Sequence, residues 1–280
     1  MPETCDRPDA GNISSNFDKS GQSALRNIKL LIAYDGTDFS GWQRQGCSES
    51  GRRIPRRTVQ GTLEAALEKI HKHPVALTGA GRTDAGVHAA GQAANFYTSI
   101  NSIPAEKFVP ALNSHLPRDI RVLDARVTLP DFHARFDARS RTYRYHLICG
   151  RPALPHELRY NLQLWRRPRL DLLAAYARLF RGELDCSVFA WPRDPSLSRS
   201  RYMYHAGFTV AGDTLVFEVC ANAFLWKMVR SLVGTLLHYE ERGTPPEELK
   251  RIIETGDRQL AGPTVAANGL FLWRVEYFRG

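Results

Sequence analysis

The order of predicted elements occurs twice along this chain, and this repetition constrains the fold more than any other feature. The first half reads strand, helix, strand, strand, helix, strand, which is the split βαβ order of ferredoxin-like sheets. Its strands are predicted at residues 28–34, 75–78, 91–97 and 120–127. Its helices are predicted at 59–70, where Thr58 can cap the first turn, and at 104–115.

The second half repeats this order. Strands are predicted at 141–148, 202–210, 214–221 and 270–277, and Gly212-Asp213 is a plausible two-residue hairpin turn. Helices are predicted at 170–180 and 226–239, with a shorter one after Pro246. We therefore expect an α+β fold of two ferredoxin-like halves, with abutting antiparallel sheets and a central cleft. Residues 28–130 and 131–280 would be the two domains, and residues 1–27, acidic and poor in apolar side chains, a disordered tail.

One segment joins two of the predicted strands and carries unusual chemistry. In the signature segment, residues 79–89, Arg82 and Asp84 stand two residues apart among glycines that permit a tight turn. A dinucleotide fingerprint would need a glycine where Asp84 stands, and a phosphate-binding Walker loop would need a Gly-Lys-Ser/Thr sequence, which this segment lacks. A structural turn in which Arg82 and Asp84 pair with each other remains an alternative reading.

Charge and cysteine content narrow the class of partner. The 280-residue chain has a formal net charge of +9, which attracts polyanions, and nucleic acid is the commonest of these. A solubilising surface charge is the other reading. Two basic stretches, 47–57 with four arginines and 192–201 with three, look like basic loops that could attract phosphates. A solvated, disordered excursion is the other reading of 47–57. The five scattered cysteines show neither zinc-ligand spacing nor a disulfide framework, which is typical of a reducing compartment. The sequence contains no run of eighteen apolar residues, so no membrane-spanning segment is predicted.

Several further motifs occur in a fixed order. They are Tyr-Asp-Gly-Thr-Asp-Phe-Ser-Gly-Trp-Gln-Arg at 34–44, Asp-Phe-His-Ala-Arg-Phe at 131–136, Arg-Thr-Tyr-Arg-Tyr at 141–145, the segment 221–234, and Asn-Gly-Leu-Phe-Leu at 268–272. Together with the signature segment they resemble the TruA family of tRNA pseudouridine synthases, from about residue 28 to the C-terminus. Several ordered motifs in both halves make this a specific resemblance.

The resemblance implies a role for individual residues. Asp84 becomes the essential aspartate, which attacks or stabilises the ribose or uracil of the substrate, and Arg82 becomes the base-flipping arginine. Tyr143 would stack on the flipped base, Arg230 would pair with Asp84, and Leu270 would line the pocket. Where the family often has two histidines before that arginine, this chain has Trp226 and Lys227.

The resemblance also implies the reaction and its partners. Uridine would be isomerised to pseudouridine at positions 38, 39 and 40 in the anticodon stem-loop of tRNA, without metal or organic cofactor. The enzyme would be a cytoplasmic homodimer whose tRNA contacts both subunits.

Two rival functions compete with this one. A non-catalytic RNA-binding module could use the same type of sheet, but its aromatic-rich strand motif is not evident and an Arg82–Asp84 arrangement has no obvious purpose in binding alone. A zinc deaminase requires His-x-Glu and Pro-Cys-x-x-Cys, and both are missing from the sequence. His88 and His133 are interpreted as structural histidines rather than general bases.

Overall fold

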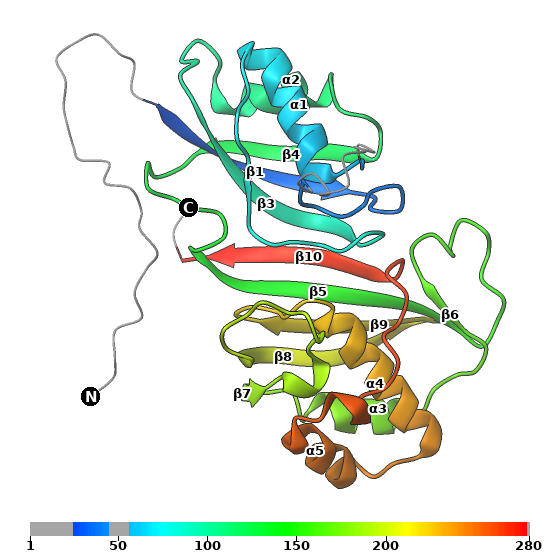
Figure 1. Cartoon of the computed structure of the whole chain (residues 1–280). Helices are drawn as coiled ribbons and strands as arrows, with labels where there is room; N and C mark the ends of the chain where they lie inside the picture. Colours follow the sequence, from blue (N-terminus) through cyan, green and yellow to red (C-terminus); the bar gives the residue numbers. More distant parts are fainter. Residues whose placement is uncertain (1–24, 45–55, 279–280) are drawn as a thin grey trace, which may run out of the picture.

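The computed structural model describes residues 25–44 and 56–278, and its ten strands form one sheet. The strands follow the order β4-β1-β3-β10-β5-β9-β8-β7, with β2 paired to β3 and β6 paired to β5. Figure 1 shows this sheet running through the whole molecule, with one group of helices in each half. The predicted tail lies outside the described residues as far as residue 24, and the basic stretch 47–57 lies outside them as far as residue 55.

The first half has the ferredoxin-like strand order β4-β1-β3-β2, as the element pattern predicts. Every pairing in this group is antiparallel. Its elements are β1 Arg26–Tyr34, α1 Val59–His71, β2 Thr78–Gly79, β3 His88–Thr98, α2 Phe108–Asn113 and β4 Ile120–Val127.

The second half repeats the arrangement as β10-β5-β9-β8, with the short β7 added at the outer edge. Its elements are β5 Ala138–Cys149, β6 Leu162–Leu164, α3 Leu170–Ala177, β7 Gly182–Asp185, β8 Ser200–Ala211, β9 Thr214–Ala221, α4 Met228–Arg242, α5 Pro246–Thr255 and β10 Leu270–Tyr277. The hairpin between β8 and β9 turns through Gly212, whose φ of 61° favours glycine.

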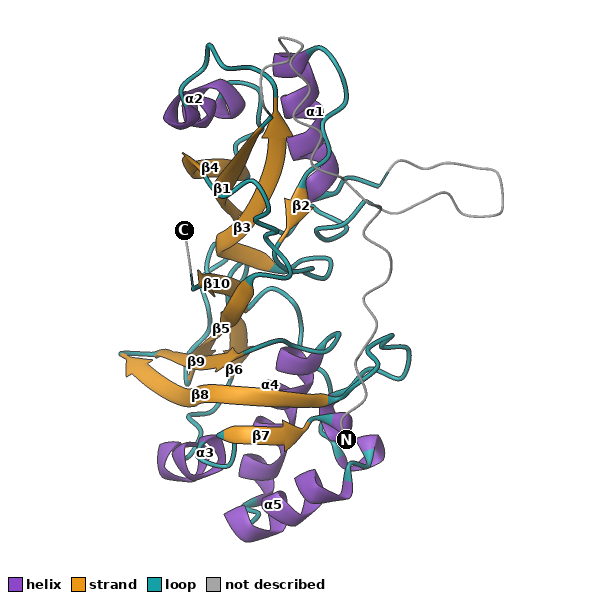
Figure 2. Ribbon diagram, turned by 90° about the vertical axis from the view of Figure 1, so that its left-hand side faces the viewer, coloured by secondary structure: helices purple, strands orange, loops and turns teal. Residues whose placement is uncertain are grey.

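The two halves meet edge to edge. Strand β10 pairs with β3 in parallel, with Phe271 opposite His88 and Leu272 opposite Ala89, and it pairs with β5 in antiparallel. The last strand of the chain therefore lies in the middle of the sheet, which is visible as the red arrow between β3 and β5 in Figure 1 and edge-on in Figure 2. The abutting sheets expected from the sequence are one continuous sheet.

Local sequence explains most of the element boundaries. Thr58 caps α1 as predicted, since its side chain accepts a hydrogen bond from the amide of Gly61, and the helix ends at Lys72 in the left-handed region. The predicted helix at 104–115 is split into a 3-10 turn, Ala105–Lys107, and the short α2. Pro110 explains this difference, because it has no amide N–H to donate to the preceding turn.

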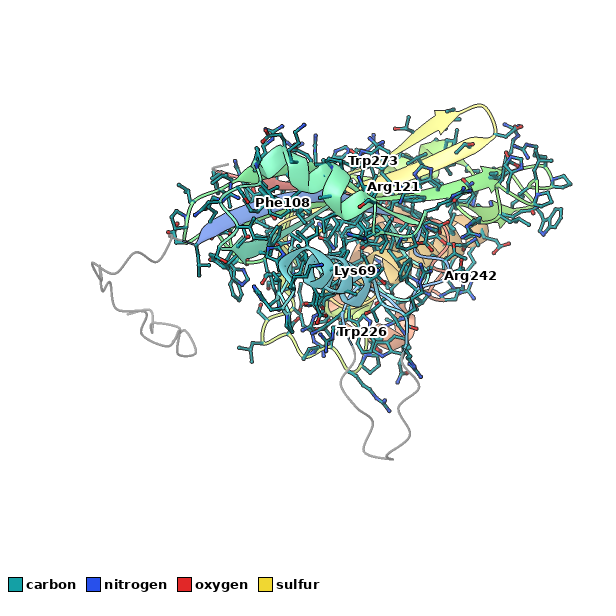
Figure 3. All side chains as sticks on the ribbon, turned by 90° about the horizontal axis from the view of Figure 1, so that it is seen from above. Lys69, Phe108, Arg121, Trp226, Arg242 and Trp273 are labelled. Carbon is teal, nitrogen blue, oxygen red and sulfur yellow. The ribbon has the colours of Figure 1, made fainter. Side chains whose placement is uncertain are left out.

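The central strands bury one face beneath the helices. Tyr143, Tyr145 and Leu147 alternate along β5 and are all buried, as their spacing predicts. Leu270 and Leu272 face the same side, because they stand opposite Tyr145 and Tyr143. Trp273 of β10 points the other way, and the view from above in Figure 3 places it on the side of the molecule opposite Trp226.

Candidate active site

The signature segment folds into a tight turn between β2 and β3. The amide of Val87 donates to the carbonyl of Asp84 across 3.2 Å, and Gly86 has a φ of 77°. A side chain at Gly86 would be strained by that φ, and its Cβ would come within 3.2 Å of the Cβ of Ala267. The turn thus displays Asp84 in one fixed backbone conformation.

The segment 34–44 packs against this turn and hydrogen-bonds to Thr83. The Tyr34 hydroxyl lies 2.8 Å from the Thr83 Oγ1, and the Trp42 amide donates to the Thr83 carbonyl across 3.0 Å. Gly41 has a φ of 101°, and a Cβ there would come within 2.7 Å of the same carbonyl. The motif at 34–44 therefore holds Thr83, the residue before Asp84, by its hydroxyl and its carbonyl.

The Asp84 carboxylate receives two donors from the second half of the chain. Arg230 Nη1 lies 3.2 Å from Oδ2, and the indole Nε1 of Trp226 donates to Oδ1 across 2.7 Å. The Asp84 side chain is 21% exposed, so solvent and ligands still reach it. Asp84 pairs with Arg230 and not with Arg82, which excludes the reading of the signature as a self-paired structural turn.

Helix α4 supplies Arg230, and a backbone carbonyl fixes the direction of its side chain. Arg230 Nε donates to the Val265 carbonyl across 2.8 Å, and the Val265 amide returns a bond of 3.3 Å to the Arg230 carbonyl. The side chain is only 16% exposed, and a planar guanidinium held at one nitrogen can present another to a carboxylate.

Tyr143 lies on the same side of the sheet as Asp84. Burial raises the pKa of its hydroxyl to about 12, and the Asp84 charge acts in the same direction, so the phenol is neutral at physiological pH. Its ring meets the edge of Phe224 at a centroid distance of 5.0 Å. Leu270, at the start of β10, is buried and stands opposite Tyr145, two residues along β5 from Tyr143.

Arg82 is exposed and makes no hydrogen bond or ion pair with any residue in the described ranges 25–44 and 56–278. Its guanidinium is therefore available to a ligand. The structure thus brings Asp84 and Arg230 together on the side of the sheet where Tyr143 of β5 lies. Arg82 is exposed and pairs with neither of them.

Trp226 is the site residue that sequence reasoning missed. The sequence shows it only as a departure from a pair of histidines, and a tryptophan just before a helix more often packs in a core. It lies before the first residue of α4, with Lys227 in the left-handed region between them, so helical spacing does not relate it to Arg230 and nothing in the sequence signals its role.

The two histidines interpreted as structural have partners that fit this role. His88 is fully buried, accepts from the Gly36 amide at Nδ1 across 3.0 Å, and lies 3.2 Å from the Asn268 carbonyl at Nε2. Burial lowers the pKa of His88, opposed by the nearby Asp35 charge. His133 Nδ1 accepts from the Arg135 and Phe136 amides in an exposed turn.

A half-buried arginine also joins the halves near the site. Arg141 of β5 donates to the Ala80 carbonyl across 3.0 Å and to the Asn222 carbonyl across 2.7 Å. These bonds tie the start of the signature segment to the loop that precedes Trp226, so they fix the relative position of Asp84 and its donors.

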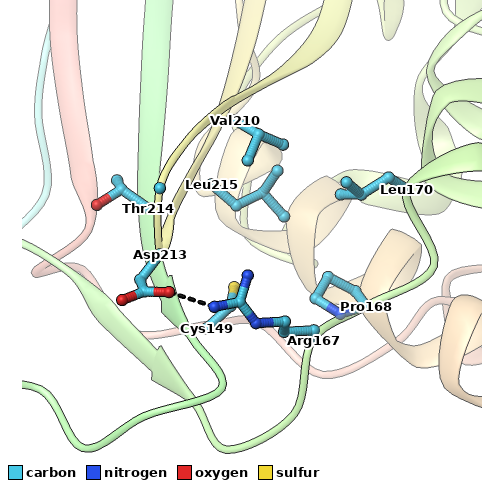
Figure 4. A pocket seen from close by; sticks show the side chains of 9 residues that line it. Cys149, Arg167, Pro168, Leu170, Val210, Asp213, Thr214 and Leu215 are labelled. Atoms are coloured by element: carbon cyan, nitrogen blue, oxygen red, sulfur yellow. Dashed lines mark hydrogen bonds and ion pairs between the residues drawn. The ribbon is translucent and has the colours of Figure 1, made fainter.

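Two cavities lie away from Asp84. One of about 50 Å³ sits beside the β8–β9 hairpin, where Figure 4 shows Arg167 bonded to Asp213 near Cys149 and Leu215. The other, of about 270 Å³, is lined in part by Asp35, Arg118 and Tyr160. Asp84 lines neither of these cavities, and its side chain remains 21% exposed to solvent.

The side chains that could bind a metal ion are dispersed. Within residues 25–44 and 56–278, no three His, Cys, Asp or Glu side chains gather as a metal ion would need. Cys149, Cys186 and Cys220 are free thiols. None of the helices in these ranges has the length and apolar character needed to cross a membrane.

Comparison with known proteins gives a consistent result. The family model described as tRNA pseudouridine synthase matches residues 30–137 and 176–278. A protein of Treponema denticola named tRNA pseudouridine synthase A is 53% identical over 252 residues, covering 90% of this chain and 93% of the relative. Its namesake from Treponema pallidum strain Nichols is 52% identical over 239 residues, covering 85% and 84%. One from Caldicellulosiruptor saccharolyticus is 40% identical over 258 residues, covering 90% and 100%.

Proposed function

This chain belongs to the tRNA pseudouridine synthase family and isomerises uridine to pseudouridine in tRNA, and we propose that its targets are positions 38, 39 and 40 of the anticodon stem-loop. The observation that carries the proposal is the Asp84 carboxylate, presented on a glycine-containing turn and held by donors from the other half of the chain. A non-catalytic RNA-binding module would not need a carboxylate placed in this way, since it repels phosphates.

The reaction moves one bond and is redox-neutral. The bond from N1 of uracil to C1′ of ribose breaks, the uracil turns, and a bond from C5 to C1′ forms. C5 then loses its proton to solvent and N1 gains one, so the composition of the nucleotide does not change. A carboxylate suits this chemistry, because positive charge develops on the sugar when the glycosidic bond breaks.

Each residue of the site has one role in this reaction. Asp84 acts as nucleophile or charge stabiliser toward the ribose or uracil, while Arg230 fixes its orientation. Arg82 fills the place of the flipped base, which offsets the few kcal/mol that unstacking costs. Tyr143 gives the extracted uracil an aromatic face, and Leu270 closes the pocket beside it. The free guanidinium of Arg82 and the shared sheet face of Tyr143 and Leu270 support these assignments.

We propose the remaining features on the same basis. Residues 28–130 and 131–280 are two domains, supported by the two ferredoxin-like strand orders. The enzyme is a cytoplasmic homodimer, and the half-buried Phe271 and Trp273 on the sheet face opposite the helices offer apolar surface to a second copy. The net charge of +9 favours binding of tRNA, which would contact both subunits.

The test uses tRNA transcripts labelled with tritium at C5 of uridine. Conversion releases tritium to water, while binding alone releases none, so the assay separates the enzyme from a binding module. Transcripts in which uridines 38, 39 and 40 are replaced one at a time by cytidine then report the target positions. Loss of release only in these transcripts supports the proposal, and undiminished release from a transcript lacking all three uridines contradicts it.

A further inference from the structure

The Asp84 carboxylate is held at both of its oxygens by different side chains. Trp226 Nε1 donates to Oδ1 across 2.7 Å, and Arg230 Nη1 lies 3.2 Å from Oδ2. One donor alone would leave the carboxylate free to turn about its Cβ–Cγ bond, whereas two donors at different oxygens fix its plane. A carboxylate has about four lone-pair positions, so two bonds still leave an open one for the substrate.

Trp226 is held in this position by contacts of its own. Its backbone amide donates to Asp194 Oδ2. The next residue, Lys227, adopts a φ of 60°, in the left-handed region where a side chain other than glycine needs support. The Lys227 ammonium lies 3.5 Å from the centroid of the Trp191 ring, which gives this strained position a cation–π contact. Trp191 in turn meets Trp226 edge-on at 6.2 Å.

Asp194, which accepts the Trp226 amide hydrogen bond, is stabilised in its charged form. Burial raises the pKa of Asp194, but hydrogen bonds from Ser196 and from the Trp226 amide more than offset this and leave the pKa below its ordinary value. The loop 192–201 therefore presents a carboxylate to the Trp226 backbone while the Trp226 indole serves Asp84. The orientation of the Trp226 indole is therefore fixed by the Lys227 backbone and by the Asp194 contact.

We propose that Trp226 is a positioning residue for the isomerisation, and that its indole N–H holds the Asp84 carboxylate in the plane from which it meets the substrate. This inference rests on the proposed function and adds a second donor to the Asp84–Arg230 pair. Trp226 is 44% exposed and acts through Asp84, so its N–H and not its bulk is the feature that matters. The indole takes this role in a position where the family often has histidine.

The test compares three variants in single-turnover tritium release with enzyme in excess. Trp226→Phe keeps an aromatic ring and removes the donor, and Trp226→His returns an N–H donor. Trp165→Phe makes the same chemical change at an exposed tryptophan away from the site and serves as the control. A hydrogen bond to a charged group corresponds to a rate difference of about 10- to 100-fold.

We expect Trp226→Phe to lower the single-turnover rate by that factor while the Kd for tRNA stays within about threefold, and we expect Trp226→His to recover much of the rate. Trp165→Phe should match the wild type. A Trp226→Phe rate equal to the wild-type rate overturns the inference, and so does a defect confined to tRNA affinity or to the melting temperature. Absence of tritium release from the wild-type enzyme would overturn the proposed function as well, which distinguishes the two failures.

Discussion

Arg230 Nη1 and Asp84 Oδ2 lie 3.2 Å apart, and this ion pair joins α4 of the second half to the turn between β2 and β3 of the first. Neither half carries the complete site. The parallel pairing of β3 with β10 and the bonds of Arg141 to Ala80 and Asn222 hold the two partners at this distance. The continuous sheet thus brings the Asp84 carboxylate together with the Arg230 guanidinium.

Arg230→Lys should be slow although it preserves the charge. A lysine has one nitrogen, and it cannot donate to the Val265 carbonyl and to Asp84 with the fixed geometry of a guanidinium. We expect a single-turnover rate lower by about 100-fold, which is in the range for removing one preorganised donor. Arg242→Lys, at the exposed end of the same helix, is the matched control and should be unaffected. Equal rates for both variants would show that Arg230 does not orient Asp84.

Arg82→Lys should separate binding from turnover. Arg82 is exposed and has no partner in the described part of the chain, so its replacement leaves the fold intact. An ammonium attracts phosphate as well as a guanidinium does, but it cannot stack as a plane in the vacated place of a base. We expect tRNA affinity within about threefold of wild type and a single-turnover rate at least about tenfold lower. A rate equal to wild type contradicts the flipping role.

Tyr143 gives a prediction that distinguishes its ring from its hydroxyl. The ring packs against Phe224, and the hydroxyl makes no hydrogen bond within residues 25–44 and 56–278. Tyr143→Phe should therefore keep most of the activity. Tyr143→Leu should lose about 5- to 160-fold in kcat/KM, because stacking of a base on an aromatic ring contributes about 1–3 kcal/mol. A large loss in Tyr143→Phe would mean that the hydroxyl, and not the ring, serves the reaction.

Asp35 should make the fold sensitive to acid. Burial raises its pKa, but bonds from Thr37, Arg159 and Tyr160 outweigh burial and lower the pKa to about 2. In the unfolded chain this group has its ordinary pKa of 3.8, so the stability it contributes is present above that pH and is lost as the pH falls toward 2. We expect the free energy of unfolding to fall by roughly 1–2 kcal/mol more in the wild type than in Asp35→Asn over this window. Denaturant titrations at several pH values measure it, and parallel pH curves would contradict the prediction.

Much of the fold is encoded locally and was predictable. The alternation along β5 and the helical spacing after Thr58 identify buried faces without knowledge of their partners. The pairing of β10 with β3 is not local, because it joins strands from the two halves of the chain, and no periodicity specifies a partner. The prediction was also wrong where a single residue ends or divides a helix, as Pro110 divides the predicted helix at 104–115.

The site was predictable to the extent that its motifs resemble a family. Asp84, Arg230 and Tyr143 came from matched positions, and the structure brings Asp84 and Arg230 together as expected. Trp226 could not be assigned in this way, because the family pattern has a different residue there. Its role depends on the direction of one N–H, which follows from the Lys227 backbone and the Asp194 contact and not from the identity of the side chain.

Single-turnover tritium release by Asp84→Asn tests the central claim most directly. Asparagine keeps the shape of the side chain and removes its charge, so the variant should bind tRNA with a Kd within about threefold of wild type. With the variant in excess over C5-labelled tRNA, we predict no release above the enzyme-free background over many wild-type half-times. Pseudouridine formed at a measurable rate by rigorously purified Asp84→Asn would contradict the account.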